Sequence, residues 1–429
     1  MVSDGDARTR REVLKGAVAV GGAGALAACL DRTSDEEPIP QGMSDRSALP
    51  DRQHAWHDRI RLDQYGNELL PRHQVLLYCT LDDSGPPTEK ARETATAAFR
   101  TIDRAYERSH EGVLFSVGYS PAYFDRFPES LTGVDLPPPR ALSSFEQPDL
   151  DTQDLLVHLA SDRPDAVLEA EEALVGDRER ANGVEVGAKL TEIASVDSRR
   201  TGFVGPGLPA EHQEEIKGIP EGGPVPEESP LFMGFIAGFQ KNQASEKYVT
   251  LKQGPFAEGT TKHVSNLRQR LDDWYGEHDY GERVSELFSP QHANRKLLTG
   301  VGENLEASSE IERFLDTIAD DASEFGRVGH AQKSARANRD EADNVLLLRR
   351  HFESTDDDIA SLHFPSLQRD ISHFEEVRKA MNGEDLTQVS PAIRQRVNNG
   401  ILEYVFTERR GNFLVPPMAL RALPPARPA

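Results

Sequence analysis

The segment HQVLLYCTL, residues 73–81, is an apolar run that is followed by turn-forming residues. A short continuous run of this kind predicts a buried strand. In the next segment, residues 90–108, apolar side chains recur at helical spacing, which predicts an amphipathic helix. The run GVLFSVG at residues 112–118 predicts a second strand. Strand, helix and strand in this order favour an α+β fold.

The rest of the chain continues this alternation of strands and helices. A strand at 154–161, a helix through Leu174 and a strand at 186–194 complete the first half. In the second half we predict strands at 231–238, 247–253, 345–352 and 359–367, and helices at 262–275 and 371–381. We therefore predict an α+β protein in which two ferredoxin-like halves form a dimeric α/β-barrel-type sandwich, with antiparallel sheets and peripheral helices.

The amino-acid composition excludes several classes of protein. Acidic residues outnumber basic ones by 72 to 49, for a formal charge of −23, which argues against nucleic acid as a main partner. Hydrophobic residues make up 37%, which excludes a disordered chain and a polytopic membrane protein. Only 11 of the basic residues are lysine. An acidic, lysine-poor surface predicts a protein from a high-salt environment; an acidic protein from a GC-rich genome is the alternative.

The N-terminal segment has the features of an export signal. Arg10 and Arg11 precede a weakly apolar run at 16–28, which is too short to span a bilayer, and Leu26-Ala27-Ala28-Cys29 follows. These features resemble a twin-arginine signal with a lipoprotein cleavage box, and a frayed N-terminal helix is the alternative. We expect export by the twin-arginine route and a lipid on Cys29 that holds the protein at the extracellular face of the membrane, or else secretion.

Four segments are expected along the chain. They are a signal peptide (1–28), an acidic linker (29–70), an N-terminal ferredoxin-like half (71–200) and a C-terminal half (201–429) that holds a cofactor. Within the C-terminal half, residues 276–344 are rich in Gly, Pro and charge, as are residues 204–230. We expect both segments to cover a cofactor or substrate cleft.

The sequence has no phosphate-binding glycine loop, CxxC pair, HExxH motif or nucleophile elbow. An ordered set of weaker motifs remains instead: Met233-Gly234-Phe235-Ile236-Ala237-Gly238, His330, VLLLRR (345–350), LHFPSLQRDI (362–371) and GNFLVPP (411–417), preceded by LFSVG (114–118), FDRF (124–127) and DLLVH (154–158). In order and spacing this set resembles the dye-decolorising peroxidase family over about residues 70–420.

The resemblance implies a haem b peroxidase with hydrogen peroxide and a bulky organic electron donor as substrates. It implies His330 as the proximal iron ligand and Arg349 as a distal arginine that stabilises charge on the peroxide. It places the glycine-loop residues Gly234, Phe235, Ala237 and Gly238 beside the haem. Homo-oligomers are a further possibility.

One position departs from the family pattern. Ala237 stands where the family has an aspartate that transfers the peroxide proton, and a methyl group cannot transfer a proton. Three functions follow as alternatives: a peroxidase in which Arg349 with a water, or another carboxylate, suffices; a haem-binding or haem-handling protein without efficient turnover; and a structural protein on the same fold without haem.

Overall fold

The computed structural model of the chain describes residues 37–428. The predicted signal peptide, the lipidation site Cys29 and the first part of the linker lie outside these residues. Within them, no helix combines the length and the hydropathy that crossing a membrane requires.

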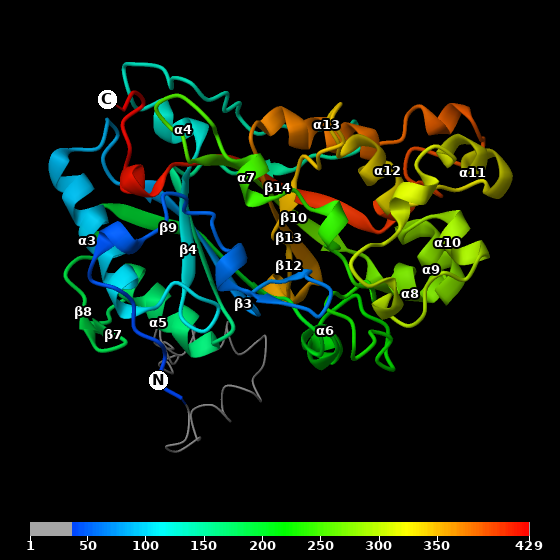
Figure 1. Cartoon of the computed structure of the whole chain (residues 1–429), viewed down its shortest axis with the longest axis horizontal. Coiled ribbons are helices and arrows are strands. Elements are labelled where there is room, and N and C mark those ends of the chain that lie inside the picture. Colours follow the sequence, from blue (N-terminus) through cyan, green and yellow to red (C-terminus); the bar gives the residue numbers. More distant parts are fainter. Residues whose placement is uncertain (1–36, 429) are drawn as a thin grey trace, which may run out of the picture.

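The N-terminal half is a four-stranded antiparallel sheet with two helices (Figure 1). Its strands pair in the order β9-β3-β6-β4, which is the ferredoxin-like arrangement, with one helix after the first strand and another after the third. The elements are β3 (His73–Leu81), α3 (Glu89–Ala105), β4 (Leu114–Tyr119), β6 (Leu155–Ser161), α5 (Pro164–Val175) and β9 (Ala194–Phe203).

The C-terminal half repeats this arrangement with strand order β14-β10-β13-β12. Figure 1 shows its helices α8–α12 gathered at the end of the molecule opposite both chain termini. The elements are β10 (Thr260–Gln269), α8 (Leu271–Glu277), α9 (Tyr280–Leu287), α10 (Pro290–Asn294), α11 (Ile318–Phe325), α12 (His330–Ala337), β11 (Leu348–Arg349), β12 (Phe352–Ser354), β13 (Ser361–Gln368), α13 (Ile371–Met381) and β14 (Val405–Val415). Shorter elements are β1 (Arg61–Leu62), β2 (Glu68–Leu69), α4 (Pro121–Phe124), β5 (Asp149–Leu150), β7 (Arg180–Ala181), β8 (Val184–Glu185), α6 (Leu208–His212) and α7 (Glu246–Val249).

The two sheets close into one barrel through two narrow seams. At one seam Leu414 of β14 pairs with Tyr119 of β4, and at the other Glu353 of β12 pairs with Phe203 of β9. Side chains from both sheets fill the space between them: Leu76, Tyr78, Leu156, Val264, Phe352 and Phe413. The predicted α+β fold with two ferredoxin-like halves is confirmed.

The strand β3 shows why the run has apolar side chains at every position from 75 to 79. Val75 and Leu77 belong to the core beneath α3 and α5, whereas Leu76 and Tyr78 face the other sheet. Because successive side chains of a strand point to opposite faces, a strand covered on both sides needs apolar residues at every position.

Four sequence-based assignments are wrong. The helix predicted at 262–275 is the strand β10 followed by α8, and the strands predicted at 186–194, 231–238 and 247–253 are mostly loops and short helices. In β10 the apolar Val264 and Leu267 are three positions apart, as in a helix, while the neighbouring polar residues Lys262, His263 and Ser265 are buried as well. Tertiary burial of polar residues therefore obscured the period of two.

Lys262 predicts a measurable pH dependence of stability. Burial, together with the charge of Arg350, lowers the pKa of Lys262 to about 7, and within residues 37–428 its Nζ has a single hydrogen-bond partner, Nδ1 of His158 at 3.0 Å. The unfolded chain keeps a lysine pKa near 10.4, so between pH 7 and 10.4 it binds one proton more than the folded chain, and stability rises with pH. Lys262→Met has no such titration, so we compare the unfolding free energy of this variant with that of wild type. The difference, variant minus wild type, should be roughly 4 kcal/mol larger at pH 6 than at pH 10.5.

Chemical denaturation at the two pH values measures this difference. Lys252→Met is the matched control, because Lys252 is exposed and no such difference is expected there. An equal effect of Lys262→Met at both pH values would show that Lys262 keeps its ordinary pKa.

Candidate functional site

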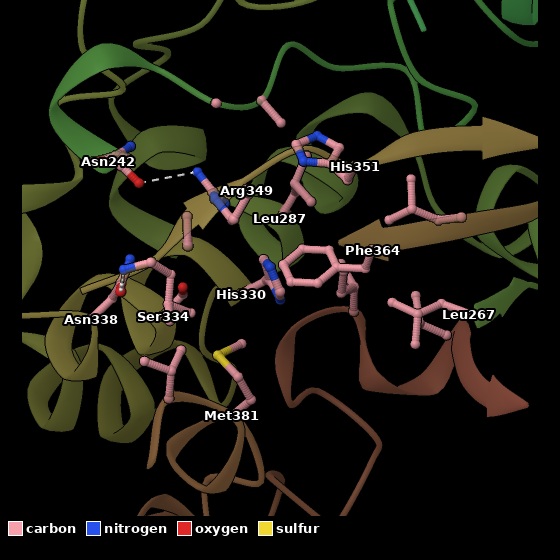
Figure 2. Close-up of a pocket in the computed structure, with 18 of the residues that line it drawn as sticks. Asn242, Leu267, Leu287, His330, Ser334, Asn338, Arg349, His351, Phe364 and Met381 are labelled. Carbon is pink, nitrogen blue, oxygen red and sulfur yellow. Dashed lines mark hydrogen bonds between the residues drawn. The ribbon is translucent and has the colours of Figure 1, made fainter. Parts of the chain in front are cut away.

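A cavity of about 240 Å³ lies in the C-terminal half, between the sheet and helices α12 and α13 (Figure 2). Strand β10 contributes Ser265, Leu267 and Gln269 to its wall, at alternate positions as a strand requires. Its apolar lining includes Leu231, Met233, Phe235, Phe239, Leu287, Phe288, Leu347, Leu362, Phe364, Phe374, Val377, Met381, Ile401 and Val405. Of the two segments expected to cover a cleft, 276–344 contributes to this wall and 204–230 does not.

His330, the first residue of α12, lies in the cavity wall. Figure 2 shows the side chains of Arg349, His351 and Phe364 around its imidazole. Within residues 37–428 neither of its ring nitrogens has a hydrogen-bond partner. Burial lowers the pKa of His330 to about 3, and the charges of Lys333 and Arg349 contribute to this shift. The imidazole is therefore neutral at pH 7, with a lone pair available to a metal.

The start of α12 is held in place from the segment that precedes β14. The backbone N–H of Gly400 donates to the carbonyl of Val328 at 2.9 Å. One turn into the helix, the Nζ of Lys333 donates to the backbone carbonyl of Asn399 (2.7 Å), to its side-chain oxygen (2.6 Å) and to the carbonyl of Met381 (2.8 Å). These contacts fix the start of α12, the helix that carries His330 as its first residue.

Gly400 allows this close approach. Its φ is +61°, and a Cβ atom there would lie 2.9 Å from the backbone nitrogen of His330. Gly400→Ala should therefore lower the free energy of unfolding by about 1–3 kcal/mol and displace the start of α12. Denaturation measures the loss; Gly276→Ala, where a Cβ would meet nothing within 4 Å, is the control and should not destabilise. Equal stability of Gly400→Ala and wild type would contradict this account.

Arg349, from β11, lies in the same wall as His330. Its Nη2 donates to the carbonyl of Asn242 at 3.2 Å, and its backbone N–H donates to Oε1 of Gln243 at 2.9 Å (Figure 2). Among the described residues no carboxylate pairs with it, and burial lowers the pKa of Arg349 to about 10. It therefore carries a positive charge that the surrounding chain does not neutralise.

Two ionisable groups that the sequence analysis missed follow Arg349 along the chain. His351 and Glu353 lie two and four residues further on, and both line the cavity. Burial lowers the pKa of His351 to about 3 and raises that of Glu353 to about 8, so both are neutral at pH 7. The alternation of the predicted strand at 345–352 was the signal that could have placed 349 and 351 on one face.

His351 is held by packing alone. Its ring is stacked on that of Phe364, with centroids 6.0 Å apart and an interplanar angle of 15°. Its Nδ1 is buried without a partner, and within 37–428 its Nε2 makes no hydrogen bond. Glu353, by contrast, accepts hydrogen bonds from the backbone N–H of Phe232 (2.8 Å) and from Nε2 of Gln269 (2.5 Å). Like His330, His351 is thus a neutral imidazole in this wall that makes no hydrogen bond within the described residues.

Some residues of the glycine loop, 233–238, line the cavity and others pack behind its wall. Phe235, Ala237 and Gly238 line the cavity, and Ala237 is exposed. Gly234 does not line it; its φ is +85°, and a Cβ there would lie 2.8 Å from the hydroxyl of Tyr275. The loop therefore presents a methyl group to the cavity at position 237, as the sequence indicated.

A family model covers most of the chain. DUF7405, described as a family of unknown function, matches residues 71–417. The chain is a member of DUF7405. A search of curated proteins gave no match to this DUF7405 member.

Solved structures show which fold this DUF7405 member has. A dye-decolorizing peroxidase from Bacteroides thetaiotaomicron is 13% identical, with 86% of this chain and 99% of that chain covered and a TM-score of 0.53. A DypB variant from Rhodococcus jostii in complex with heme is 14% identical (83% and 96% covered, TM-score 0.51), and the encapsulated DyP-type peroxidase from Mycobacterium smegmatis is 15% identical (91% and 99%, TM-score 0.50). The DUF7405 member has the fold of the dye-decolorising peroxidases.

Proposed function

We propose that this DUF7405 member binds haem b in the cavity and catalyses the peroxide-dependent oxidation of a bulky organic donor. The observation that carries the proposal is the free, neutral imidazole of His330 in a cavity wall that also contains the unpaired Arg349. The fold of the dye-decolorising peroxidases supports it, and one of the similar structures is a complex with heme.

The residues of the cavity fit a haem in three respects. Its wall is largely apolar, as a flat macrocycle requires. The α12 residues that line the cavity after His330 are small, namely Ala331, Ser334 and Ala335, and leave space beside the imidazole. The arginines of the wall match the two carboxylates of haem b in charge. Bound haem would supply the iron at which peroxide is reduced.

Three polar residues of the wall would then have distinct tasks. His330 would hold the iron through one ring nitrogen. Arg349 stabilises negative charge that develops on a peroxide oxygen, because its guanidinium is fixed and unpaired in a site of low dielectric constant. His351 accepts the peroxide proton at Nε2, the task that Ala237 cannot perform.

Reconstitution with haem tests the proposal. The full chain is titrated with haem, its absorption spectrum is recorded, and peroxide-dependent oxidation of a dye is measured. We expect Arg349→Leu to retain the haem spectrum and to lose activity by about 10²–10³-fold, the usual effect of removing one fixed donor to an oxyanion. Absence of saturable haem binding by the wild type would refute the proposal.

Ala237 favours a second candidate function, a haem-binding or haem-handling protein without efficient turnover. Its methyl group occupies the cavity-facing position of the glycine loop. If wild type binds haem without peroxidase activity and Ala237→Asp creates activity, this second function replaces the first.

We also propose that the protein is exported and lipid-anchored through Cys29. The twin-arginine pair and the Leu-Ala-Ala-Cys box support this. Incorporation of labelled fatty acid in wild type and its loss in Cys29→Ser would be the expected result; equal labelling of both would contradict it.

A further inference from the structure

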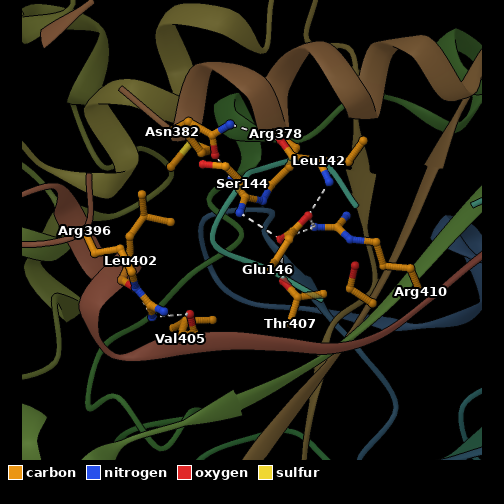
Figure 3. Close-up of polar contacts among 12 residues, drawn as sticks. Leu142, Ser144, Glu146, Arg378, Asn382, Arg396, Leu402, Val405, Thr407 and Arg410 are labelled. Carbon is orange, nitrogen blue, oxygen red and sulfur yellow. Dashed lines mark hydrogen bonds and ion pairs between the residues drawn. The ribbon is translucent and has the colours of Figure 1, made fainter. Parts of the chain in front are cut away.

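A buried cluster of one carboxylate and two arginines lies beside the cavity, and both arginines line it (Figure 3). Glu146 belongs to a loop of the N-terminal half and reaches across to the C-terminal half. There both of its oxygens accept from Nη2 of Arg410 at 2.9 Å, and Oε2 also accepts from Nη2 of Arg378 and Oγ1 of Thr407, each at 3.1 Å. Arg378, Thr407 and Arg410 all line the cavity.

A β-bulge places these groups on the cavity face. Thr407 lies opposite Leu267 and Arg409 lies opposite Asn266, so Glu408 is an extra residue in β14. Without it, Thr407 and Arg410, three positions apart, would point to opposite faces of the sheet. With it, Arg410 lies opposite Ser265, whose side chain also lines the cavity.

Glu146 leaves Arg410 half satisfied. A guanidinium usually binds a carboxylate through two of its nitrogens, but Arg410 uses Nη2 alone. Its Nε and Nη1 are buried and have no hydrogen-bond partner within residues 37–428, although the side chain is only 1% exposed. Glu146 cannot serve them, because its oxygens already accept from Arg378, Thr407 and the backbone of Leu142 as well.

The cavity wall as a whole also carries more positive than negative charge. Of its four arginines, Arg339 pairs with Asp343, Arg378 and Arg410 share Glu146, and Arg349 has no carboxylate partner in the described chain. Four guanidinium charges against two carboxylates leave two positive charges around a largely apolar space. Buried charges of this kind are normally paired, so a ligand with carboxylate groups would complete the site.

We propose that Arg410, with Arg378, forms a carboxylate-binding subsite in this part of the cavity wall. The carboxylate belongs either to the porphyrin or to an organic donor. The inference rests on the proposed function for the identity of the cavity's ligand, but the subsite needs neither iron nor His330.

Metal-free protoporphyrin IX tests the subsite separately from the iron site. The full-length apoprotein is titrated with protoporphyrin IX and with its dimethyl ester, in wild type and in Arg410→Leu. We expect Arg410→Leu to weaken binding of the acid about tenfold or more and to leave binding of the ester unchanged. Arg410→Lys keeps the charge and loses the fork, so it protects the test against a folding defect; an intermediate loss is expected.

Arg409→Leu is the matched control. Arg409 is the next residue of β14, lies on the other face of the strand and pairs with Asp149 and Asp151. It should leave both dissociation constants unchanged. Equal weakening of acid and ester binding by Arg410→Leu, or equal weakening of acid binding by the substitutions at 409 and 410, would overturn the subsite.

A second arm identifies the source of the carboxylate. Haem-loaded wild type and Arg410→Leu are titrated with benzoate and with neutral benzamide, and perturbation of the haem absorption is recorded. If Arg410→Leu weakens the binding of benzoate but not of protoporphyrin, the subsite belongs to a donor. If it weakens the binding of protoporphyrin but not of benzoate, the subsite belongs to the porphyrin. No dependence in either arm overturns the proposal. Failure of the proposed function would appear elsewhere, as a haem spectrum that does not change in His330→Ala.

Discussion

His330→Ala is expected to abolish the spectrum of histidine-ligated haem and to reduce peroxidase turnover to background. In residues 37–428 the imidazole of His330 has no hydrogen bond of its own, so its removal would take away the iron ligand that we propose without breaking a hydrogen-bond network. Haem titration followed by absorption spectroscopy, together with a dye-oxidation assay, measures both effects.

Added imidazole provides the control for this variant. Alanine leaves a space the size of the missing ring in an apolar wall, and free imidazole can occupy it and ligate the iron. Rescue of the spectrum by imidazole, with unchanged thermal stability of the apoprotein, would separate loss of a ligand from loss of the fold. An unaltered haem spectrum in His330→Ala would exclude His330 as the ligand.

His351→Ala should slow the reaction with peroxide by about 10²–10⁴-fold, the usual cost of removing a positioned acid–base group. Burial and the nearby charge of Arg349 lower the pKa of His351 to about 3, so the ring is neutral over most of the accessible pH range and keeps a nitrogen lone pair that can accept a hydrogen bond from peroxide. Stopped-flow mixing of the haem-loaded protein with peroxide gives the rate. The haem affinity should not change.

Two further observations make the role of His351 testable. Ala237→Asp in the His351→Ala background should restore part of the rate, because residue 237 lines the same cavity and an aspartate there supplies a proton acceptor. A full rate in His351→Ala would contradict the acid–base role. A change from six-coordinate to five-coordinate haem in this variant would show instead that His351 binds the iron.

The cavity contains residues of both kinds, those that the sequence predicted and those that it did not. His330 and Arg349 were predicted through a family resemblance and line the same wall, although their roles stay predictions. Glu353 and Arg410 were missed for a physical reason. Glutamate and arginine are usually surface residues, so the sequence does not indicate that these two are buried. Only their surroundings in the structure reveal that Glu353 is neutral and that Arg410 is incompletely paired.

The sequence by itself determined the elements whose periodicity burial does not disturb. The strand β3 and the helix α13 were predicted with their observed boundaries. The apolar residues of β3 form one continuous run, and those of α13 recur at helical spacing, so both patterns can be recognised along the chain. Only the tertiary structure decided the nature of β10, where the buried polar side chains of Lys262 and His263 have partners on the strands β6 and β14. It also decided which face Arg410 occupies, because the extra residue at Glu408 becomes visible only when β14 is aligned against β10.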